Sequence, residues 1–175
     1  MNLISCNCAG ASIYKFIINK PYNNPFIWCL TDVVSLAKYW GHINFHKIRI
    51  FNEHDLDGIW HINIDNKVDV RYVHAVFDPN AQQVQIIQPT PTQNAEIRYN
   101  KIWEYLTYTY YKRLARMDVT EPPLYVLYNA NKVLPQLSQY TDRIIDIPVD
   151  TTGGIVHGVI SARDYIMEKL AMFGY

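Results

Sequence analysis

The chain has 175 residues, which is enough for one globular domain with a hydrophobic core. Apolar residues make up 49% of it, and 16 basic residues balance 16 acidic ones, so the formal net charge is zero. This balance argues against a broad electrostatic surface for nucleic acid or anionic membrane, although it leaves room for a local patch. We expect a single domain over residues 1–175, with its weakest boundary near residues 88–95 and no nucleic-acid partner.

The cysteine content and the hydrophobic runs of the sequence indicate where in the cell the protein is located. Three cysteines without a Cys-x-x-Cys pair do not make a complete disulfide framework. The N-terminus has no basic segment followed by a long apolar core, and no run approaches the roughly 18 apolar residues of a membrane span. These features predict a cytoplasmic protein without stable membrane insertion, and nothing in the pattern specifies an oligomeric state.

The first predicted elements are a short strand, a tight turn and a helix. The strand begins at Leu3 and runs into a turn of small and polar residues that contains Cys8. The residues Ile13, Phe16 and Ile17 then recur at helical spacing, which predicts one apolar helix face. A proline-containing loop and a short apolar run over residues 26–30 follow.

A second helix and four strands come next. We expect Thr31 to cap the helix, with Asp32 in its first turn and Gly41 at its end. Alternating apolar and polar residues predict half-buried antiparallel strands, with a hairpin turn at residues 65–67. The predicted strands span residues 46–51, 58–64, 68–77 and 83–88.

The longest predicted helix covers residues 96–117, after a loop at residues 88–94. One apolar stripe follows spacings of three and four along it. The stripe consists of Tyr99, Trp103, Leu106, Tyr110, Leu114 and Met117. Lys112, Arg113 and Arg116 gather in the last turns, where they suit the negative end of the helix dipole.

The C-terminal third alternates strands and helices. We expect strands at residues 124–127 and 143–147, a short helix at residues 131–139, and a final helix capped by Ser161. That final helix would turn Tyr165, Leu170 and Phe173 inward. The chain therefore predicts an α/β fold of mixed α+β type, in which a central mixed sheet is flanked by helices.

Cys8 is the first candidate for chemistry because it lies where the first strand passes into the first helix. Unpaired N–H groups and the helix dipole at that point lower the pKa of a thiol and favour the nucleophilic thiolate. Cysteine hydrolases and acyl-transferases need such a nucleophile, with donors nearby for an oxyanion. The alternative is that Cys6 and Cys8 are ordinary small buried residues.

A thiolate nucleophile needs a histidine base and a polar group that orients the imidazole. His74 is the best placed, since strand alternation puts it on one face with Tyr72, and Asp78 is the first candidate to orient it. Asn80, Gln85 and Asp69 are further candidates for that role, and His157, in a glycine-rich loop, is the second candidate base. The alternative is a structural or solvent-facing His74. The other histidines (His42, His46, His54 and His61) lack metal-site spacing, so we predict neither a metal nor a cofactor.

The chain opens with Ile-Ser-Cys-Asn-Cys-Ala-Gly, followed by Ile-Tyr-Lys and then by Pro-Tyr-Asn-Asn-Pro-Phe. These segments resemble the start typical of a bacterial family of exopolysaccharide-biosynthesis proteins, which is similar to papain-like cysteine peptidases. The run Val68 to His74 resembles its middle motif, and the segment around Trp103, Arg113 and Arg116 resembles a later tryptophan-arginine segment. The resemblance runs in order over about the first two-thirds of the chain.

This resemblance implies a cysteine-dependent hydrolase or acyl-transferase of cell-surface polysaccharide biosynthesis. Cys8 would form the covalent intermediate, His74 would act as base and then acid, and the N–H of Cys8 with Asn7 or the Gly10 turn would hold the oxyanion. Tyr72, Arg113 and Arg116 would contact the substrate, a carbohydrate or lipid-linked glycan, because arginine forks suit carboxylates and phosphates.

Two alternatives come from other classes of protein. A non-catalytic glycan-binding or scaffolding module would use exposed tyrosines (Tyr105, Tyr108 and Tyr111) to stack on sugars or on a partner. A glycosyltransferase would need an acidic metal motif, for which Asp55-Leu56-Asp57 is the only candidate, and this segment is more simply a turn.

Overall fold

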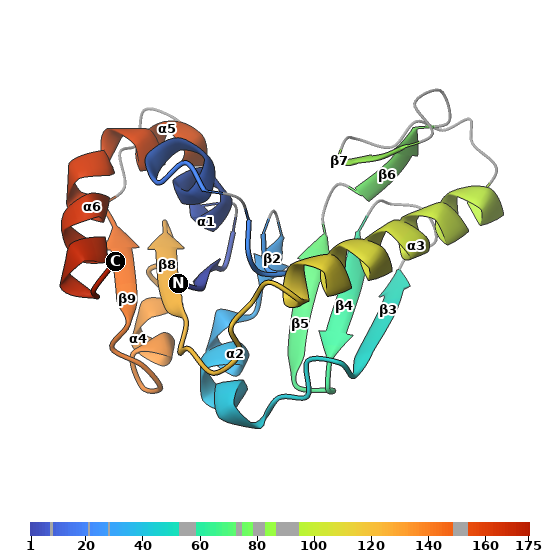
Figure 1. Cartoon of the computed structure of the whole chain (residues 1–175), viewed down its shortest axis with the longest axis horizontal. Helices are drawn as coiled ribbons and strands as arrows, with labels where there is room; N and C mark the ends of the chain where they lie inside the picture. Colours follow the sequence, from blue (N-terminus) through green and yellow to red (C-terminus); the bar gives the residue numbers. More distant parts are fainter. Residues whose placement is uncertain are drawn as a thin grey trace.

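The computed structural model describes residues 1–7, 9–20, 22–27, 29–52, 59–72, 75–78, 83–86, 95–148 and 154–175, and between residues 73 and 98 only the backbone. Within these residues the strands form a three-stranded parallel sheet, a four-stranded antiparallel sheet and a two-stranded hairpin (Figure 1). The mixed α+β class predicted from the sequence is thus confirmed. Parallel and antiparallel strands lie in separate sheets, where the sequence predicted one central mixed sheet.

The parallel sheet has the order β1-β8-β9 and is buried on both faces. Its strands are β1 (Leu3–Ser5), β8 (Leu124–Tyr128) and β9 (Ile144–Ile147). Alternate residues face opposite layers: Leu3 and Val126 face one hydrophobic cluster, whereas Ile4 and Tyr125 face the other. Burial on both faces explains why β8 is a continuous apolar run and not an alternating one.

Helices from both ends of the chain cover one face of this sheet. They are α1 (Ala9–Ser12), the π-helix η1 (Ile13–Ile17), α5 (Ile155–Ser161) and α6 (Arg163–Met172). Ile13 and Ile17 are buried as predicted, but Phe16 is 37% exposed, because the wider π turn changes which residues share a face. Ser161 is the last residue of α5 and not the predicted cap of the final helix, because α5 precedes α6 where the sequence predicted a loop and the N-cap of α6 is Ala162.

The antiparallel sheet has the order β2-β5-β4-β3. Its strands are β2 (Leu30–Thr31), β5 (Val68–Tyr72), β4 (Trp60–Ile64) and β3 (Ile48–Asn52). Asp65 and Asn66 have φ angles of 52° and 56°, as a tight hairpin turn requires, so the predicted turn is confirmed. The predicted strand over residues 68–77 is divided: β5 ends at Tyr72, and β6 (Ala75–Asp78) pairs with β7 (Gln83–Ile86).

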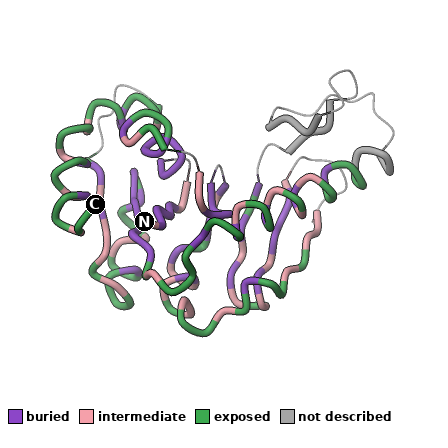
Figure 2. Tube along the Cα trace, viewed as in Figure 1, coloured by how far each residue is buried: buried purple, intermediate pink, exposed green. Residues whose placement is uncertain are grey.

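The long helix α3 (Ala95–Leu114) lies across the antiparallel sheet (Figure 1). Its buried residues follow a spacing of four: Ile102, Leu106, Tyr110 and Leu114. The stripe predicted at its start was wrong, because Tyr99 and Trp103 are 41% and 43% exposed and Ile102 takes the inward position. Figure 2 shows the same alternation, with green and purple segments along the helix.

Three short helical segments complete the fold: α2 (Val33–Tyr39), the 3-10 helix η2 (Trp40–His42) and α4 (Leu134–Leu137). The cap of α2 is Asp32 and not Thr31 as predicted, since the carboxylate of Asp32 accepts the N–H of Ser35 at 3.0 Å. Thr31 instead pairs with Val70 as part of β2.

One hydrophobic cluster joins the two main sheets. It contains Ile4 and Leu127 from the parallel sheet, Ile62 from the antiparallel sheet and Leu106 from α3, all nearly inaccessible to solvent. The second cluster lies between the parallel sheet and the covering helices. Among the described residues, no helix has the length and apolar character needed to cross a bilayer.

Candidate functional site

A cation-lined groove, here called the basic groove, separates η1 and the loop after it from the C-terminal half of α3. It is open to solvent and has a volume of about 750 Å³. The described residues that line it are Lys15, Asn19, Lys20, Tyr22, Tyr105, Tyr108, Thr109, Lys112, Arg113 and Arg116. A groove of this size accommodates a ligand larger than a single sugar.

Helical periodicity builds one wall of the basic groove. Its α3 residues recur at spacings of three and four from Tyr105 to Arg116, so they form one stripe that starts within α3 and continues into the turn after it. The opposite wall belongs to the N-terminal segment. There η1 ends at Ile17, and Asn19, with a φ of 48°, turns the chain toward Tyr22. The two walls are thus far apart in the sequence.

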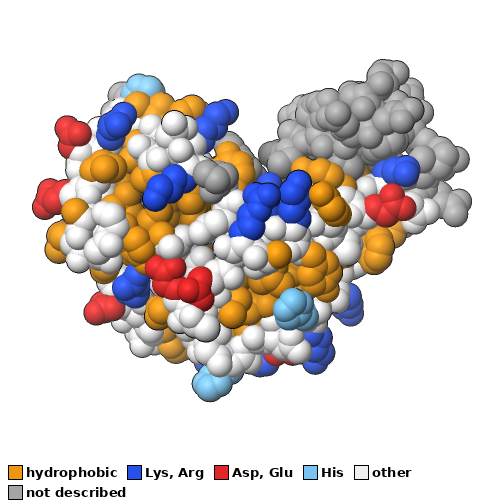
Figure 3. Space-filling view, in the orientation of Figure 1, with side chains coloured by type: hydrophobic (Ala, Val, Ile, Leu, Met, Phe, Trp, Pro, Cys, Tyr) orange, Lys and Arg blue, Asp and Glu red, His pale blue; other side chains and the backbone are white. Residues whose placement is uncertain are grey.

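The basic groove concentrates positive charge on a chain of zero net charge. Five of its lining residues are lysine or arginine, and none of the described lining residues is acidic. None of these five cations forms an ion pair with a described carboxylate. Blue side chains gather beside the C-terminal end of α3 in Figure 3. Such a surface attracts anions.

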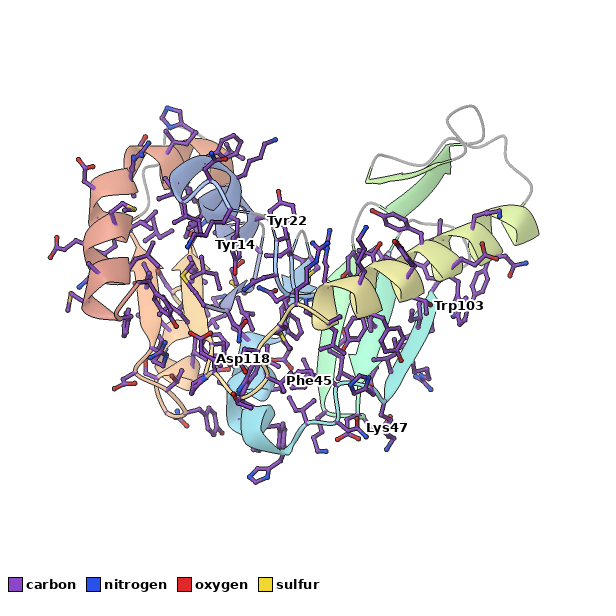
Figure 4. All side chains as sticks on the ribbon, viewed as in Figure 1. Tyr14, Tyr22, Phe45, Lys47, Trp103 and Asp118 are labelled. Atoms are coloured by element: carbon purple, nitrogen blue, oxygen red, sulfur yellow. The ribbon has the colours of Figure 1, made fainter. Side chains whose placement is uncertain are left out.

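Arg113 is the most firmly held of the groove cations. It is half-buried, its Nη1 donates to the carbonyl of Ile27 at 3.2 Å, and its guanidinium lies 5.7 Å from the ring centroid of Tyr22. The Tyr22 ring in turn meets Tyr14 edge-on, with ring centroids 6.1 Å apart (Figure 4). Because these contacts already hold the Arg113 guanidinium in place, the side chain loses less conformational entropy when it binds an anion.

Lys112 and Arg116 flank Arg113 and are exposed. The Lys112 Nζ lies 5.2 Å from the ring centroid of Tyr108, a weak cation–π contact at an exposed site. These two long side chains have room to move toward a ligand. Arg113 and Arg116, which the sequence predicted as substrate contacts, therefore lie together in the basic groove.

The turn after β1, where the sequence placed the nucleophile, is tied together by its own polar groups. Cys8 itself lies outside the described residues. The Asn7 Nδ2 donates to the carbonyl of Tyr128, and the Asn7 Oδ1 accepts the N–H of Ala9, both at 3.0 Å. The Ser5 hydroxyl donates to the Asn7 carbonyl and accepts the Gly10 N–H at 3.0 Å. The two oxyanion donors predicted at Asn7 and Gly10 are therefore engaged within the chain.

The other two cysteines are poor nucleophiles. Burial raises the pKa of the Cys6 thiol. Cys29 is 2% exposed, and its Sγ lies 3.4 Å from the hydroxyl of Thr31. The interpretation of Cys6 as a small, partly buried structural residue fits these surroundings.

The predicted base and its orienting group fall largely outside the described part of the chain. His74 and Asn80 lie outside it, as do residues 53–58 with the Asp-Leu-Asp segment. Asp78 belongs to β6, and its backbone alone is described. Asp69, considered as an alternative orienting group, instead accepts from the Nδ1 of His61 at 3.0 Å.

Two further predictions are corrected. Tyr72 lies in the core, 4% exposed, and its hydroxyl donates to the carbonyl of Pro25 at 2.9 Å, so it does not reach a surface where substrate would bind. Burial raises the pKa of this hydroxyl well above its usual value. His157 lies on the exposed side of α5, 3.5 Å from the hydroxyl of Ser161, and not in a loop.

Sequence reasoning missed the N-terminal wall of the basic groove. Lys15, Lys20 and Tyr22 carried no signal that linked them to α3, because their proximity depends on how the two sheets pack. The α3 wall had a signal in the spacing that joins Tyr105 and Tyr108 to Lys112 and Arg116. Among the described residues, no group of three histidine, cysteine, aspartate or glutamate side chains gathers as metal ligands.

No family model, curated protein or solved structure matches the chain. The resemblance to exopolysaccharide-biosynthesis proteins therefore stays a prediction.

Proposed function

We propose that the protein binds an anionic carbohydrate in the basic groove. The observation that carries this proposal is the convergence of five cations from two distant segments, with no described carboxylate among the lining residues. Bringing like charges together opposes folding unless a ligand or counterion offsets the repulsion. A groove that gathers five cations, none of them in an ion pair with a described carboxylate, is suited to an anion.

The remaining lining residues favour a carbohydrate over a simple inorganic anion. Tyr22, Tyr105 and Tyr108 supply aromatic rings, on which the apolar face of a sugar packs. Asn19 and Thr109 supply an amide and a hydroxyl that pair with sugar hydroxyls. A groove with aromatic walls and a few polar groups is typical of small-molecule sites.

Isothermal titration calorimetry with two oligosaccharides of equal length tests this proposal. One carries glucuronic acid and the other is neutral. We expect binding of the acidic one, weakened by added salt and lost in Lys112→Glu and Arg116→Glu. The matched control is Arg163→Glu, an exposed charge reversal at the start of α6, which should leave binding unchanged. Measurable binding of both oligosaccharides with equal affinity, or equal effects of all three substitutions, would contradict the proposal.

A second candidate function is the cysteine hydrolase or acyl-transferase. What supports it is the turn after β1, in which Ser5, Asn7 and Gly10 hold the residues on both sides of Cys8 in a defined geometry. The carboxyl ends of parallel strands are also the usual place for sites in such sheets. Cys8 would attack, and His74, oriented by Asp78, would serve as base.

Thiol labelling with iodoacetamide across pH tests the second candidate. The background is low, because the pKa of Cys6 is raised and Cys29 is buried. A catalytic Cys8 should react well below the usual thiol pKa, and His74→Ala should move that profile. Cys8→Ser should abolish the fast reaction. A normal thiol profile, or labelling only after denaturation, would exclude this function.

A further inference from the structure

The basic groove changes character along α3. Its stripe begins with Tyr105, Tyr108 and Thr109 and ends with Lys112, Arg113 and Arg116. With a rise of about 1.5 Å per residue, the stripe is about 16 Å long and divides near its middle. The α3 wall of the basic groove therefore has an aromatic end and a cationic end.

The cationic end is larger than a single phosphate requires. Lys112 and Arg116 lie one turn apart, about 6 Å along the helix, with Arg113 between them. Lys15 and Lys20 add two further cations to the opposite wall of the same groove. Three cationic side chains within four residues of the α3 stripe are suited to two linked phosphates.

The α3 residues of the aromatic end include no cation, although Lys112 of the cationic end reaches the Tyr108 ring, with its Nζ 5.2 Å from the ring centroid. Tyr108 is 63% exposed, and Tyr105 is half-buried beside it. A polysaccharide with an acid on every repeating unit would place charge here as well, where the wall offers rings and a hydroxyl. An uncharged sugar ring matches this wall better.

We propose that the ligand is a sugar joined to a diphosphate, with the diphosphate at the cationic end and the sugar ring against Tyr105 and Tyr108. This inference rests on the proposed function, since it specifies the ligand of the same groove. The far side of the diphosphate carries either a nucleoside or an isoprenoid lipid, and the shared sugar–diphosphate chemistry is what the basic groove recognises.

Calorimetry with paired probes tests the orientation. The pairs are UDP and UDP-glucose, and farnesyl diphosphate with and without glucose. In each pair the ratio of the two affinities measures how much the sugar contributes to binding. We expect the sugar to increase affinity about tenfold in the pair with the natural carrier, as one well-placed aromatic contact with its hydrogen bonds does. The pair that shows the gain identifies the carrier.

Two groove variants and one control separate the ends. The double substitution Tyr105→Leu with Tyr108→Leu should remove the sugar's gain while inorganic diphosphate still binds. Arg116→Glu should weaken every probe, inorganic diphosphate included. The control Tyr140→Leu replaces a tyrosine that is 44% exposed outside the basic groove, and it should change nothing.

The outcomes distinguish the two proposals. If no anionic probe binds, including inorganic diphosphate and the glucuronic acid oligosaccharide, the proposed function itself fails. If the acidic oligosaccharide binds but the sugar adds nothing in either diphosphate pair, the orientation is wrong and the proposed function survives. A sugar gain that persists in the tyrosine double variant would also overturn the inference.

Discussion

The turn after β1 and the basic groove use polar residues in opposite ways. In the turn, the side chains of Ser5 and Asn7 pair with backbone groups of the same fold. In the basic groove, five cations converge without a described carboxylate partner. The first arrangement stabilises the chain, whereas the second adds repulsion that a ligand would relieve. The comparison shows that the residues of a recognisable sequence motif are not always the residues that form a ligand-binding surface.

The largest expected effect is next to the turn, at Gly158→Ala. A Cβ there would lie 2.3 Å from the hydroxyl oxygen of Tyr128, so either α5 or the buried Tyr128 ring must shift. We expect a loss of about 1–3 kcal/mol in the free energy of unfolding, measured by urea denaturation. The control Gly41→Ala has no atom within 4 Å of the new Cβ and should cost nothing. Equal stability of both variants would show that α5 does not pack as described.

A smaller loss is expected for Asn7→Ala. This change removes the hydrogen bonds to the Tyr128 carbonyl and from the Ala9 N–H. It should destabilise the protein by about 1 kcal/mol, while the affinity of groove ligands stays the same. The exposed Asn131→Ala is the matched control. If Asn7→Ala instead left stability intact and abolished ligand binding, the roles assigned to the two regions would be reversed.

In the basic groove we expect substitutions to lower ligand affinity and to leave stability nearly unchanged. Replacing Lys112 and Arg116 together by alanine removes two exposed like charges four residues apart, a pair that is weakly repulsive. Stability should change by less than about 0.5 kcal/mol, while anion affinity falls by tenfold or more, on the order expected for charged hydrogen bonds. Thermal unfolding and calorimetry on the same sample measure both. A large loss of stability would mean that these cations hold the fold.

The smallest effect is expected at the hairpin turn, which lies outside both regions. The Lys67 ammonium beside it lowers the pKa of Asp65 from the usual 3.8 to about 2. A lowered pKa contributes stability above pH 4 that is lost as the pH falls toward 2. Asp65→Asn should therefore reduce the change in melting temperature between pH 4 and pH 2. The same variant should bind ligand at neutral pH with unchanged affinity. Measuring both quantities separates the effect of low pH on the stability of the fold from its effect on ligand binding.

Local patterns predicted most of the individual elements but not how they assemble. The apolar run at residues 124–127 and the hairpin turn at residues 65–67 are confirmed because their signals are local. The inward placement of Tyr99 and Trp103 was wrong, because the packing of α3 on the sheet turns Ile102 inward in their place. The burial of Tyr72 and the wall formed by Lys15 and Lys20 depend on contacts distant in sequence, which spacing alone does not encode.

The most direct test of the central claim is a map of where an anionic ligand binds. Amide chemical shifts, recorded by NMR during titration with inorganic diphosphate, locate the contact residue by residue. We predict that the shifts concentrate at residues 105–116 and 15–22, while Asn7, Asn129 and the start of α5 stay constant. Shifts that gather at the carboxyl ends of the parallel strands, with residues 105–116 unchanged, would contradict this account.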